Sequence, residues 1–308
     1  MTILVLGGTG FIGSRLTQRF VDRGHKVICF DLYPDYAKVA HLDGVEVLAG
    51  DVTHIESLLD AIEKCSVQRI VNLAYILPPE SEEKLQLAVR VNLMGMNNVF
   101  ETARLMGIKR VVYASSIGVY GLQSSYGDRP VTEEDDCYPE TVYTAHKLWN
   151  EFMAHKYMER YDMLLPGLRI ANVFGPGRTK GVSAWQGRCI DNLAMGRPAT
   201  FMSRRDQKLL IVYVDDTAEI FASLCLAETL NHAVYNSLAY SLTAQEFADK
   251  IRALLPDADI NFDETAPDQP NVYLWSSERI ERDLNMQLPP IEEMIQRHID
   301  EVRRVQSS

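Results

Sequence analysis

The chain has 308 residues, of which 46% are apolar and 24% charged, and its formal net charge is −11. This composition is that of a globular protein with a large core, and it excludes a disordered, collagen-like or low-complexity chain. An acidic chain without a basic run lacks the clustered Lys and Arg that phosphate backbones require. Nucleic acid and membrane surfaces are therefore not expected partners.

The cysteines and the apolar runs set further limits. Five cysteines are spread through the chain with no CxxC pair, and the seven histidines show no metal-ligand spacing. We therefore expect neither a disulfide framework nor a metal site, and reduced thiols favour a cytoplasmic protein. The apolar run at residues 2–6 meets glycines too soon for a signal peptide, and no run of about 18 apolar residues predicts a membrane span.

Short apolar runs alternate with helical periodicity in the first half of the chain. Helices are predicted over 11–23, 55–64, 83–106 (one long helix or two) and 143–161. Between them, strands are predicted over 3–6, 26–31, 45–49, 69–73, 110–114 and 164–170. Strands that are apolar on both faces and separated by helices indicate a parallel sheet covered on both sides. The predicted fold is a doubly wound α/β domain.

The pattern changes after residue 170, where glycines and prolines become frequent. A strand is predicted over 209–214, then a helix that Asp215 and Asp216 cap, and a further strand over 233–236. We predict a cofactor-binding domain over 1–170, to which 209–239 returns. Residues 171–208 and 240–308 are predicted to form a smaller C-terminal α/β lobe for the substrate.

The strongest motif lies between the first predicted strand and the first predicted helix. Gly7, Gly10 and Gly13 satisfy G-x-x-G-x-x-G, and with Gly8 the segment also satisfies G-x-G-x-x-G. Glycine lets the backbone approach a pyrophosphate, and the helix N-terminus offers free N–H groups and a partial positive charge. Because the motif sits in a strand–turn–helix context, it predicts a Rossmann-type dinucleotide-binding fold.

Asp31 ends the second predicted strand, eighteen positions after Gly13. A carboxylate about 20 residues after the motif accepts hydrogen bonds from the adenosine ribose hydroxyls and repels a 2′-phosphate. No Arg follows at 32–34, so the sequence favours NAD over NADP.

Two further motifs carry groups suited to proton transfer. Tyr143 and Lys147 lie four residues apart, on one face of a predicted helix. A phenol with a pKa near ~10 is a poor base, but a nearby ammonium favours the phenolate, which then acts as a general base. Ser115 and Ser116 follow a strand at the edge where doubly wound sheets bind ligands. They either bond a substrate oxygen or cap a turn.

These motifs, in this order and spacing, resemble the extended short-chain dehydrogenase/reductases, the NAD-dependent epimerase/dehydratase group that includes UDP-glucose 4-epimerases. The resemblance covers about the first 240 residues. It extends to the segments at 50–52, 72–75, 91–95, 168–176 and 213–216.

The resemblance implies NAD as cofactor and Ser116, Tyr143 and Lys147 as the catalytic set. Tyr143 would take the hydroxyl proton, Ser116 would hold the oxygen, and Lys147 would hold the phenolate and the ribose. The implied cofactor contacts are Gly7, Gly10, Phe11, Ile12, Gly13, Asp31, Leu32, Asp51, Val52, Leu73, Ala74, Tyr75, Asn92, Ser115, Tyr143, Lys147 and Ile170. The implied substrate contacts are Ser116, Asn172, Trp185, Arg204 and Arg205.

Departures from the family pattern bear on the reaction. The dehydratases carry an acid pair where this chain has Ile117 and Gly118, so dehydration is not expected. In many nucleotide-sugar enzymes an Arg that binds the diphosphate stands where this chain has Leu209. Arg204 and Arg205 are the candidates to replace it.

Three functions stay open. A sugar or nucleotide-sugar 4-epimerase, favoured by the family, would return the hydride to the other face with no net change in NAD. A dehydrogenase of a small sugar, hydroxy acid or alcohol, favoured by Leu209, would release NADH. A non-catalytic NAD-sensing regulator is the third. Family members dimerise through two long helices, so a homodimer is expected through 83–106 and 143–161.

Overall fold

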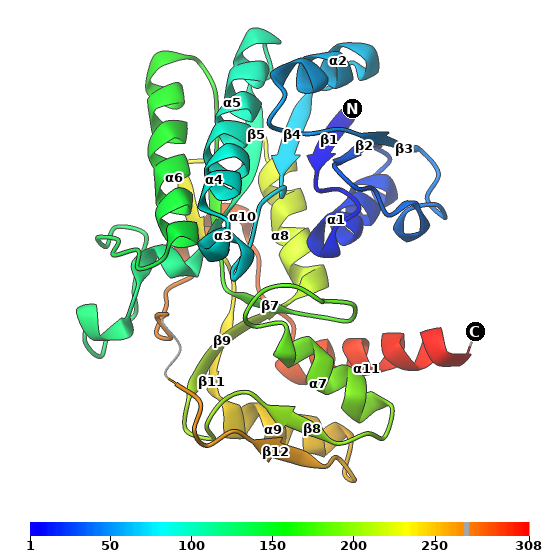
Figure 1. Cartoon of the computed structure of the whole chain (residues 1–308), viewed down its shortest axis with the longest axis vertical. Coiled ribbons are helices and arrows are strands. Elements are labelled where there is room, and N and C mark those ends of the chain that lie inside the picture. The colour runs from blue at the N-terminus through cyan, green and yellow to red at the C-terminus, as the bar shows by residue number, and fades with distance from the viewer. Residues whose placement is uncertain (268–270, 308) are drawn as a thin grey trace.

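The computed structural model describes residues 1–267 and 271–307, and Figure 1 shows it as a larger upper part and a smaller lower part. The larger part contains a seven-stranded parallel sheet, ordered β10-β6-β5-β4-β1-β2-β3. This order confirms the predicted doubly wound sheet. In the order of the sheet the strands are β10 (Val234–Asn236), β6 (Gly167–Ile170), β5 (Arg110–Ser116), β4 (Arg69–Asn72), β1 (Thr2–Leu6), β2 (Lys26–Asp31) and β3 (Val45–Ala49).

Helices cover both faces of this sheet because its strands are apolar on both faces. Successive side chains of a strand point to opposite faces. In β1, Ile3 and Val5 pack in one buried cluster, with α1 and α8, whereas Leu4 and Leu6 pack in another, with α2, α5 and α6. The helices around the sheet are α1 (Phe11–Asp22), α8 (Val214–Leu226), α10 (Glu278–Leu284), α2 (Ile55–Cys65), α5 (Met96–Leu105) and α6 (Val142–Arg160).

The strand order reverses between β1 and β4. From β1 the chain builds outward through β2 to β3, and then returns to place β4 on the other side of β1. Such a switch point opens a crevice beyond the carboxyl ends of the strands, where doubly wound proteins bind ligands. The fold therefore places the ligand site at the lower edge of the sheet in Figure 1, facing the smaller part.

The predicted helix over 83–106 is four segments in the structure. They are α3 (Glu80–Glu83), α4 (Leu85–Ala88), the π-helix η2 (Val89–Gly95) and α5. Within η2, the Asn92 amide accepts a hydrogen bond from the Ile76 N–H (2.8 Å) and donates one to the Ile76 carbonyl (3.1 Å). The wider helical turn thus carries a side chain that holds the segment after β4. Sequence periodicity does not reveal this contact, and π-turns often mark functional sites.

Two boundary predictions were wrong. The strand predicted from residue 164 begins at Gly167, after Pro166, which has no N–H to donate to a ladder. Helix α8 begins at Val214 with Tyr213 at its N-cap, so Asp215 and Asp216 lie in its first turn and do not cap it. These two acids instead form ion pairs with arginines of α1 and α11.

The smaller part holds a three-stranded sheet, ordered β11-β9-β7, and a two-stranded sheet of β12 and β8. Of the predicted return segment 209–239, α8 and β10 lie in the larger part, whereas β9 pairs with β7 and β11. Residues 268–270 and 308 of the predicted 240–308 segment lie outside the described residues. The elements are β7 (Asn172–Phe174), β9 (Lys208–Tyr213), β11 (Tyr240–Thr243), β8 (Ala199–Phe201), β12 (Ile260–Phe262), α7 (Trp185–Ala194), α9 (Ala244–Leu254) and α11 (Ile291–Ser307).

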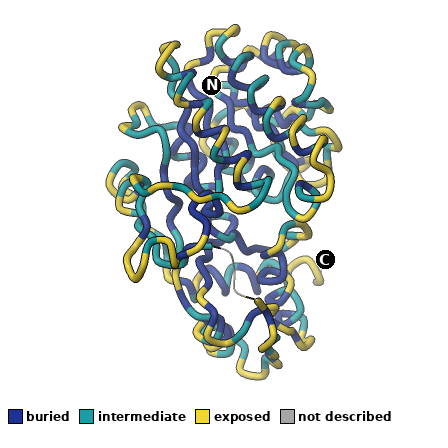
Figure 2. The backbone as a smooth tube through the Cα atoms, turned by 60° about the vertical axis from the view of Figure 1, so that its left-hand side comes forward, coloured by how far each residue is buried: buried dark blue, intermediate teal, exposed yellow. Residues whose placement is uncertain are grey.

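Figure 2 shows the buried backbone, in dark blue, running through both parts. In the smaller part the buried residues come from strands and helices far apart in sequence, from Ala171 to Ile299. The part of the chain that the structure describes has no helix that is long and apolar enough to cross a bilayer.

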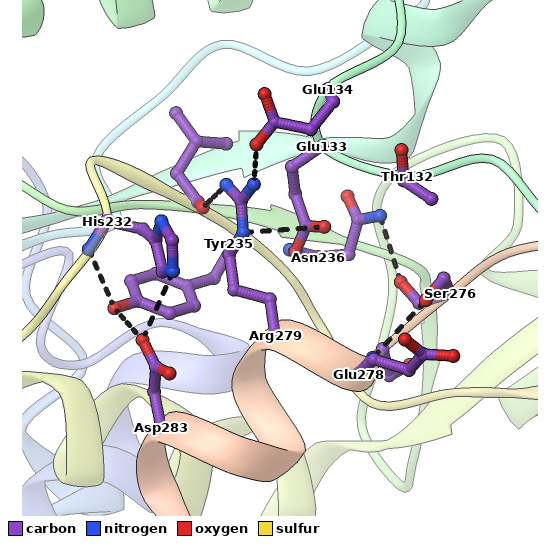
Figure 3. Close-up of polar contacts among 12 residues, drawn as sticks. Thr132, Glu133, Glu134, His232, Tyr235, Asn236, Ser276, Glu278, Arg279 and Asp283 are labelled. Carbon is purple, nitrogen blue, oxygen red and sulfur yellow. Dashed lines mark hydrogen bonds and ion pairs between the residues drawn. The ribbon is translucent and has the colours of Figure 1, made fainter.

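Strand β10 is the edge of the large sheet, and side chains satisfy its backbone groups (Figure 3). The Asn236 N–H donates to Glu133 (2.8 Å), and Arg279 of α10 donates to the Val234 carbonyl (2.9 Å). Arg279 also pairs with Glu133 and Glu134. These contacts occupy backbone groups that an edge strand otherwise leaves open to pairing.

Candidate active site

The turn between β1 and α1 has no room for side chains at its glycines. A Cβ on Gly13 would lie 1.9 Å from the Gly7 carbonyl oxygen, and one on Gly10 would lie 3.0 Å from it. Gly7 has a φ of +78°, which L-residues rarely adopt. Helix α1 begins after Gly10 without a side-chain cap, so its first N–H groups are left for a ligand.

Asp31 ends β2 beside this turn, and Thr9 holds it there. The Thr9 N–H and hydroxyl each donate to Asp31 Oδ2 at 2.6 Å. Thr9 Oγ1 also accepts a hydrogen bond from the Asp35 N–H (3.1 Å), which ties down the segment after β2. Burial raises the pKa of Asp31, against the hydrogen bonds from Thr9, which lower it. The carboxylate is therefore oriented toward the glycine turn.

The other predicted cofactor residues follow the carboxyl ends of neighbouring strands and so reach the same edge. The segment after β4 lies against the glycine turn, because a Cβ on Gly7 would be 3.2 Å from the Ala74 nitrogen. Val52, after β3, lies against Gly95 of the π-helix. The residues brought to this edge are Asp31 and Leu32 after β2, Asp51 and Val52 after β3, Leu73, Ala74 and Tyr75 after β4, Asn92 in η2, Ser115 on β5 and Ile170 on β6.

The two serines at the end of β5 have different partners. Ser116 Oγ accepts a hydrogen bond from the Gly118 N–H (3.2 Å) and so caps the short helix η3 (Ile117–Tyr120). Ser115 is buried, and its hydroxyl donates to Glu151 of α6 at 2.5 Å. Ser116 is therefore the serine that lies beside Tyr143, whereas the Ser115 hydroxyl points into the protein.

Tyr143 and Lys147 lie on one face of α6, and the ring of Tyr75 packs against both. The Tyr75 and Tyr143 rings meet edge to face with centroids 5.5 Å apart. Lys147 Nζ lies 3.3 Å from the Tyr75 ring centroid and 5.4 Å from that of Tyr143. It also donates to the Ala114 carbonyl on β5 at 2.6 Å. The predicted Ser–Tyr–Lys set is thus brought together from β5 and α6.

Burial dominates the protonation of this set. It raises the pKa of Tyr143 to about 12, against a hydrogen bond with Ser116 and the positive charge of Arg178, which lower it. Burial also lowers the pKa of Lys147 well below its usual range, and the negative charge of Glu151 opposes this. Each group is pushed toward its neutral form, so added charge in the site decides when Tyr143 loses its proton.

These features fit a dinucleotide. The glycine turn would hold the pyrophosphate, Asp31 the adenosine ribose, and the edge from β4 to β6 the nicotinamide end. NAD, when bound, supplies the hydride chemistry. The chain itself offers the Tyr143 phenol and the Ser116 hydroxyl at that end.

A cavity of about 510 Å³ opens between the two parts, and it is related to Ser116 through Gly118, because a Cβ on Gly118 would lie 3.5 Å from Ser116 Oγ. Asn271, on its wall, lies 3.6 Å from the position that a Cβ on Gly118 would take. The wall combines amides, two cations, two acids and an apolar strand. Among the residues that line it are Gln123, Asp128, Asn172, Gln186, Arg204, Asp206, Gln207, Lys208, Leu209 and Asn271.

The predicted substrate residues divide into two groups around this cavity. Asn172 and Arg204 line it, as does Leu209. Trp185 packs in the core against Phe201, with ring centroids 5.2 Å apart, and its neighbour Gln186 faces the cavity. Arg205 turns to the surface, where it pairs with Glu264 (2.7 Å) and lies over the Phe262 ring.

Sequence reasoning missed four side chains at this site. Thr9 orients Asp31, and Arg178 adds a positive charge near Tyr143. Glu82 of α3 accepts hydrogen bonds from the Val142 and Tyr143 N–H groups at 2.9 and 3.0 Å, so it caps α6. Only Glu151 had a signal in the sequence, because it follows Lys147 at the same four-residue spacing.

A glycine turn at the switch point, an acid after β2 and a buried Tyr–Lys pair define a dinucleotide-dependent enzyme with a doubly wound fold. Residues 3–236 match the family described as "NAD dependent epimerase/dehydratase family". The chain belongs to that family, which confirms the expected NAD-dependent enzyme.

Relatives and solved structures agree with this family membership. The chain is 34% identical over 188 residues to Protein CapI of Staphylococcus aureus, covering 57% of this chain and 55% of that protein, so the match spans about half of that relative. It is 30% identical over 229 residues to the UDP-glucose 4-epimerase of Mycolicibacterium smegmatis, 72% of either chain. The fold is similar to that of the Thermus thermophilus UDP-glucose 4-epimerase complex with NAD (TM-score 0.83, 23% identity, covering 98% and 99%). It is also similar to that of a GalE-like L-threonine dehydrogenase from Cupriavidus necator (TM-score 0.87, 22% identity, covering 98% and 100%).

Proposed function

We propose that this enzyme is a 4-epimerase of a nucleotide sugar, with Ser116, Tyr143 and Lys147 acting at the reacting carbinol. The observation that carries the proposal is the cavity between β9 and the loops at 122–128 and 271–273, which has both polar and apolar groups at its wall and is large enough for such a ligand. The similarity to curated 4-epimerases supports it, including a probable UDP-glucuronate 4-epimerase of Rhizobium meliloti (26% identity over 235 residues, 73% of this chain and 68% of that one).

The proposed reaction removes one proton from the C4 hydroxyl and one hydride from C4, and later returns both. Tyr143 would take the proton of the C4 hydroxyl, and Ser116 would donate a hydrogen bond to the oxygen of the resulting ketone. NAD, held by the glycine turn and Asp31, would be the acceptor of the C4 hydride. After the sugar turns over, the hydride returns to the opposite face and Tyr143 returns the proton. The positive charge of Arg178 favours the anionic form of Tyr143 that the first step requires, and Lys147 adds to this effect when it is protonated.

The nucleotide end of the substrate would lie along β9. Leu209 stands where many relatives carry an Arg, so it offers no charge to a diphosphate. Arg204 and Lys208 on the same wall supply positive charge instead. Arg204 is held by the Ala266 carbonyl (2.7 Å) and Asp206 (3.4 Å). A guanidinium oriented in this way suits a diphosphate oxygen.

The test is turnover of nucleotide sugars by NAD-loaded protein. We expect UDP to raise the melting temperature and UDP-glucose or UDP-glucuronate to give its C4 epimer, seen by NMR, with no lasting absorbance of NADH at 340 nm. If no UDP, GDP or dTDP compound shifts the melting temperature or is epimerised, the proposal is wrong.

A second candidate is a dehydrogenase of a small hydroxy compound, and Leu209 is the observation that favours it. An apolar wall at that position suits a substrate without a diphosphate. Such an enzyme would give NADH in proportion to substrate consumed. Solved dehydrogenases of this fold act on L-threonine, so L-threonine belongs in the same screen.

We also propose a homodimer formed by α6 and the helices before it. Helices α5 and α6 lie side by side (Figure 1), and their outer side carries large exposed apolar groups. Trp149 and Phe152 are 50% and 53% exposed, and Leu85, Val89 and Met94 are also exposed. Burying such a patch favours self-association. Light scattering at micromolar concentration should give twice the chain mass, and Trp149→Glu should give the monomer mass.

A cytoplasmic location is our third proposal. All five cysteines are free, and burial raises the pKa of the Cys29, Cys189 and Cys225 thiols to about 11, 12 and 12. Free cysteines suit a reducing compartment. Cell fractionation with an antibody against the chain tests this, and recovery outside the cytoplasm would contradict it.

A further inference from the structure

A buried ion pair lies behind the catalytic set. Glu151 and Arg169 are each only 6% exposed at the side chain. Arg169 Nε donates to Glu151 Oε1 at 3.0 Å, and Nη2 donates to Oε2 at 2.7 Å. The Arg belongs to the family-like segment 168–176, yet the proposed reaction gives it no role.

This pair joins three elements that carry the site. Glu151 is on α6, Arg169 is on β6, and Ser115, which donates to Glu151, is on β5. Ser115 and Arg169 are partners in the ladder between β5 and β6. One carboxylate therefore spans two neighbouring strands from the helix above them.

The same carboxylate lies close to the catalytic residues along the chain. Tyr143, Lys147 and Glu151 follow each other at four-residue intervals, which places them along one face of α6. Ser115, its partner, is flanked by Ala114, whose carbonyl binds Lys147, and by Ser116. A change at Glu151 is therefore expected to affect both α6, which carries Tyr143 and Lys147, and the end of β5, which carries Ser116.

The network continues beyond Arg169. Arg169 Nη1 donates to the Tyr120 hydroxyl (2.6 Å), which donates to Asn236 Oδ1 (2.7 Å). The network ends where the Asn236 N–H donates to Glu133 (Figure 3). Glu151 holds Arg169 and Ser115 and also lies one helical turn after Lys147 on α6, where its negative charge opposes the lowering of the Lys147 pKa by burial.

We propose that Glu151 is a positioning residue that clamps α6 to β5 and β6 and supplies the negative charge that keeps the Lys147 ammonium in place. This inference rests on the role proposed for Lys147, but not on the identity of the substrate. A buried ammonium is costly unless a negative charge lies nearby. The titratable or charged groups around it are Tyr143 and Glu151 on α6, Tyr75 after β4, Tyr113 on β5, Arg169 on β6 and Arg178 after β7.

The test is a double-mutant cycle between Glu151→Gln and Lys147→Met, read by urea unfolding of the full chain from pH 6 to pH 10. It needs no substrate, so it can fail independently of the proposed epimerase. We expect Glu151→Gln to lower the urea midpoint more in the protein with Lys147 than in the Lys147→Met background. This excess should shrink as the pH rises and Lys147 loses its proton. An excess of zero, or one that does not change with pH, would mean that Glu151 acts only as a clamp.

A second variant separates the charge from the fold. Glu151→Gln/Arg169→Gln removes the whole buried pair, and we expect it to recover stability relative to Glu151→Gln. The double variant loses one negative and one positive charge near Lys147, so the alkaline limb of its kcat profile should lie close to that of the wild type. In Glu151→Gln alone, the alkaline limb should lie about one pH unit below that of the wild type. An alkaline limb of Glu151→Gln at the wild-type pH would overturn the proposal. Asp216→Asn, which breaks a pair with Arg297 away from the site, is the matched control and should leave the kcat profile unchanged.

Discussion

The two parts of the molecule build their share of the site in different ways. In the larger part, functional groups follow the carboxyl ends of neighbouring parallel strands, so a single edge collects residues from 7 to 170. The cavity wall, in contrast, is assembled from β9 and α7 of the smaller part and from loops at 122–128, 204–207 and 271–273. The cofactor and catalytic half thus depends on short contiguous motifs, whereas the substrate half depends on how distant segments pack.

The largest effect is expected from a substitution that changes only the catalytic half of the site. Tyr143→Phe should lower turnover by about 10²–10⁴-fold, because the proton acceptor is lost. Binding of NAD, measured by calorimetry, should persist, because the glycine turn is untouched. Tyr138→Phe, at a ring that is 49% exposed, is the control and should turn over normally. Unchanged turnover of Tyr143→Phe would show that another group accepts the proton.

The second prediction tests the close contact in the glycine turn. Gly13→Ala places a methyl group 1.9 Å from the Gly7 oxygen, so we expect a loss of about 1–3 kcal/mol of stability and weaker NAD binding. Gly10→Ala, at 3.0 Å from the same oxygen, should have a smaller effect. Thermal unfolding and NAD titration measure both. Equal effects of the two variants would contradict the tight packing described for Gly13.

The third prediction tests the substrate half. Arg204→Gln should weaken binding of the nucleotide part by about 10- to 100-fold, since a charge-assisted hydrogen bond contributes about 1.5–3 kcal/mol. The kcat should change little. Arg205→Gln is the matched control, because that side chain pairs with Glu264 at the surface. If both variants bind nucleotide as the wild type does, β9 is not the diphosphate wall.

The smallest expected effect lies at the start of α6. The pKa of Glu82 is lowered overall. Burial alone would raise this pKa, but the hydrogen bonds from the Tyr143 and Val142 N–H groups outweigh that effect. A lowered pKa means that the cap stabilises the fold above the ordinary Glu pKa of about 4.3 and that this stability is lost as the pH falls through the lowered value. Wild type and Glu82→Gln should therefore differ in melting temperature at pH 7 and converge as the pH falls through the lowered pKa of Glu82. A constant difference across this range would assign the effect to packing.

The regular elements of the larger part could be predicted because their signals are local. The apolar runs of β1 and β2 and the glycine turn identified the sheet and its ligand edge. The predictions failed where a tertiary contact outweighs periodicity. Asn92 holds Ile76 from a widened helical turn, and Asp215 and Asp216 pair with arginines where a cap was expected.

The substrate side shows the limit most clearly. Arg204 and Arg205 are adjacent and chemically identical, so the sequence has no means to separate them. Packing against Phe262 and Glu264 turns one to the surface, and the loop ending at Ala266 holds the other at the cavity. Likewise, adjacent Ser115 and Ser116 point to different places because they alternate along a strand.

By itself, then, the sequence determined the parallel sheet, the dinucleotide turn and the Tyr–Lys face of α6, because strand alternation, helical spacing and glycine sterics act between near neighbours. Only the tertiary structure decided which arginine lines the cavity, that Glu82 caps α6, and that Glu151 joins α6 to Ser115 and Arg169. Those contacts connect residues from 18 to 62 positions apart, and their geometry exists only once the sheet and helices have packed.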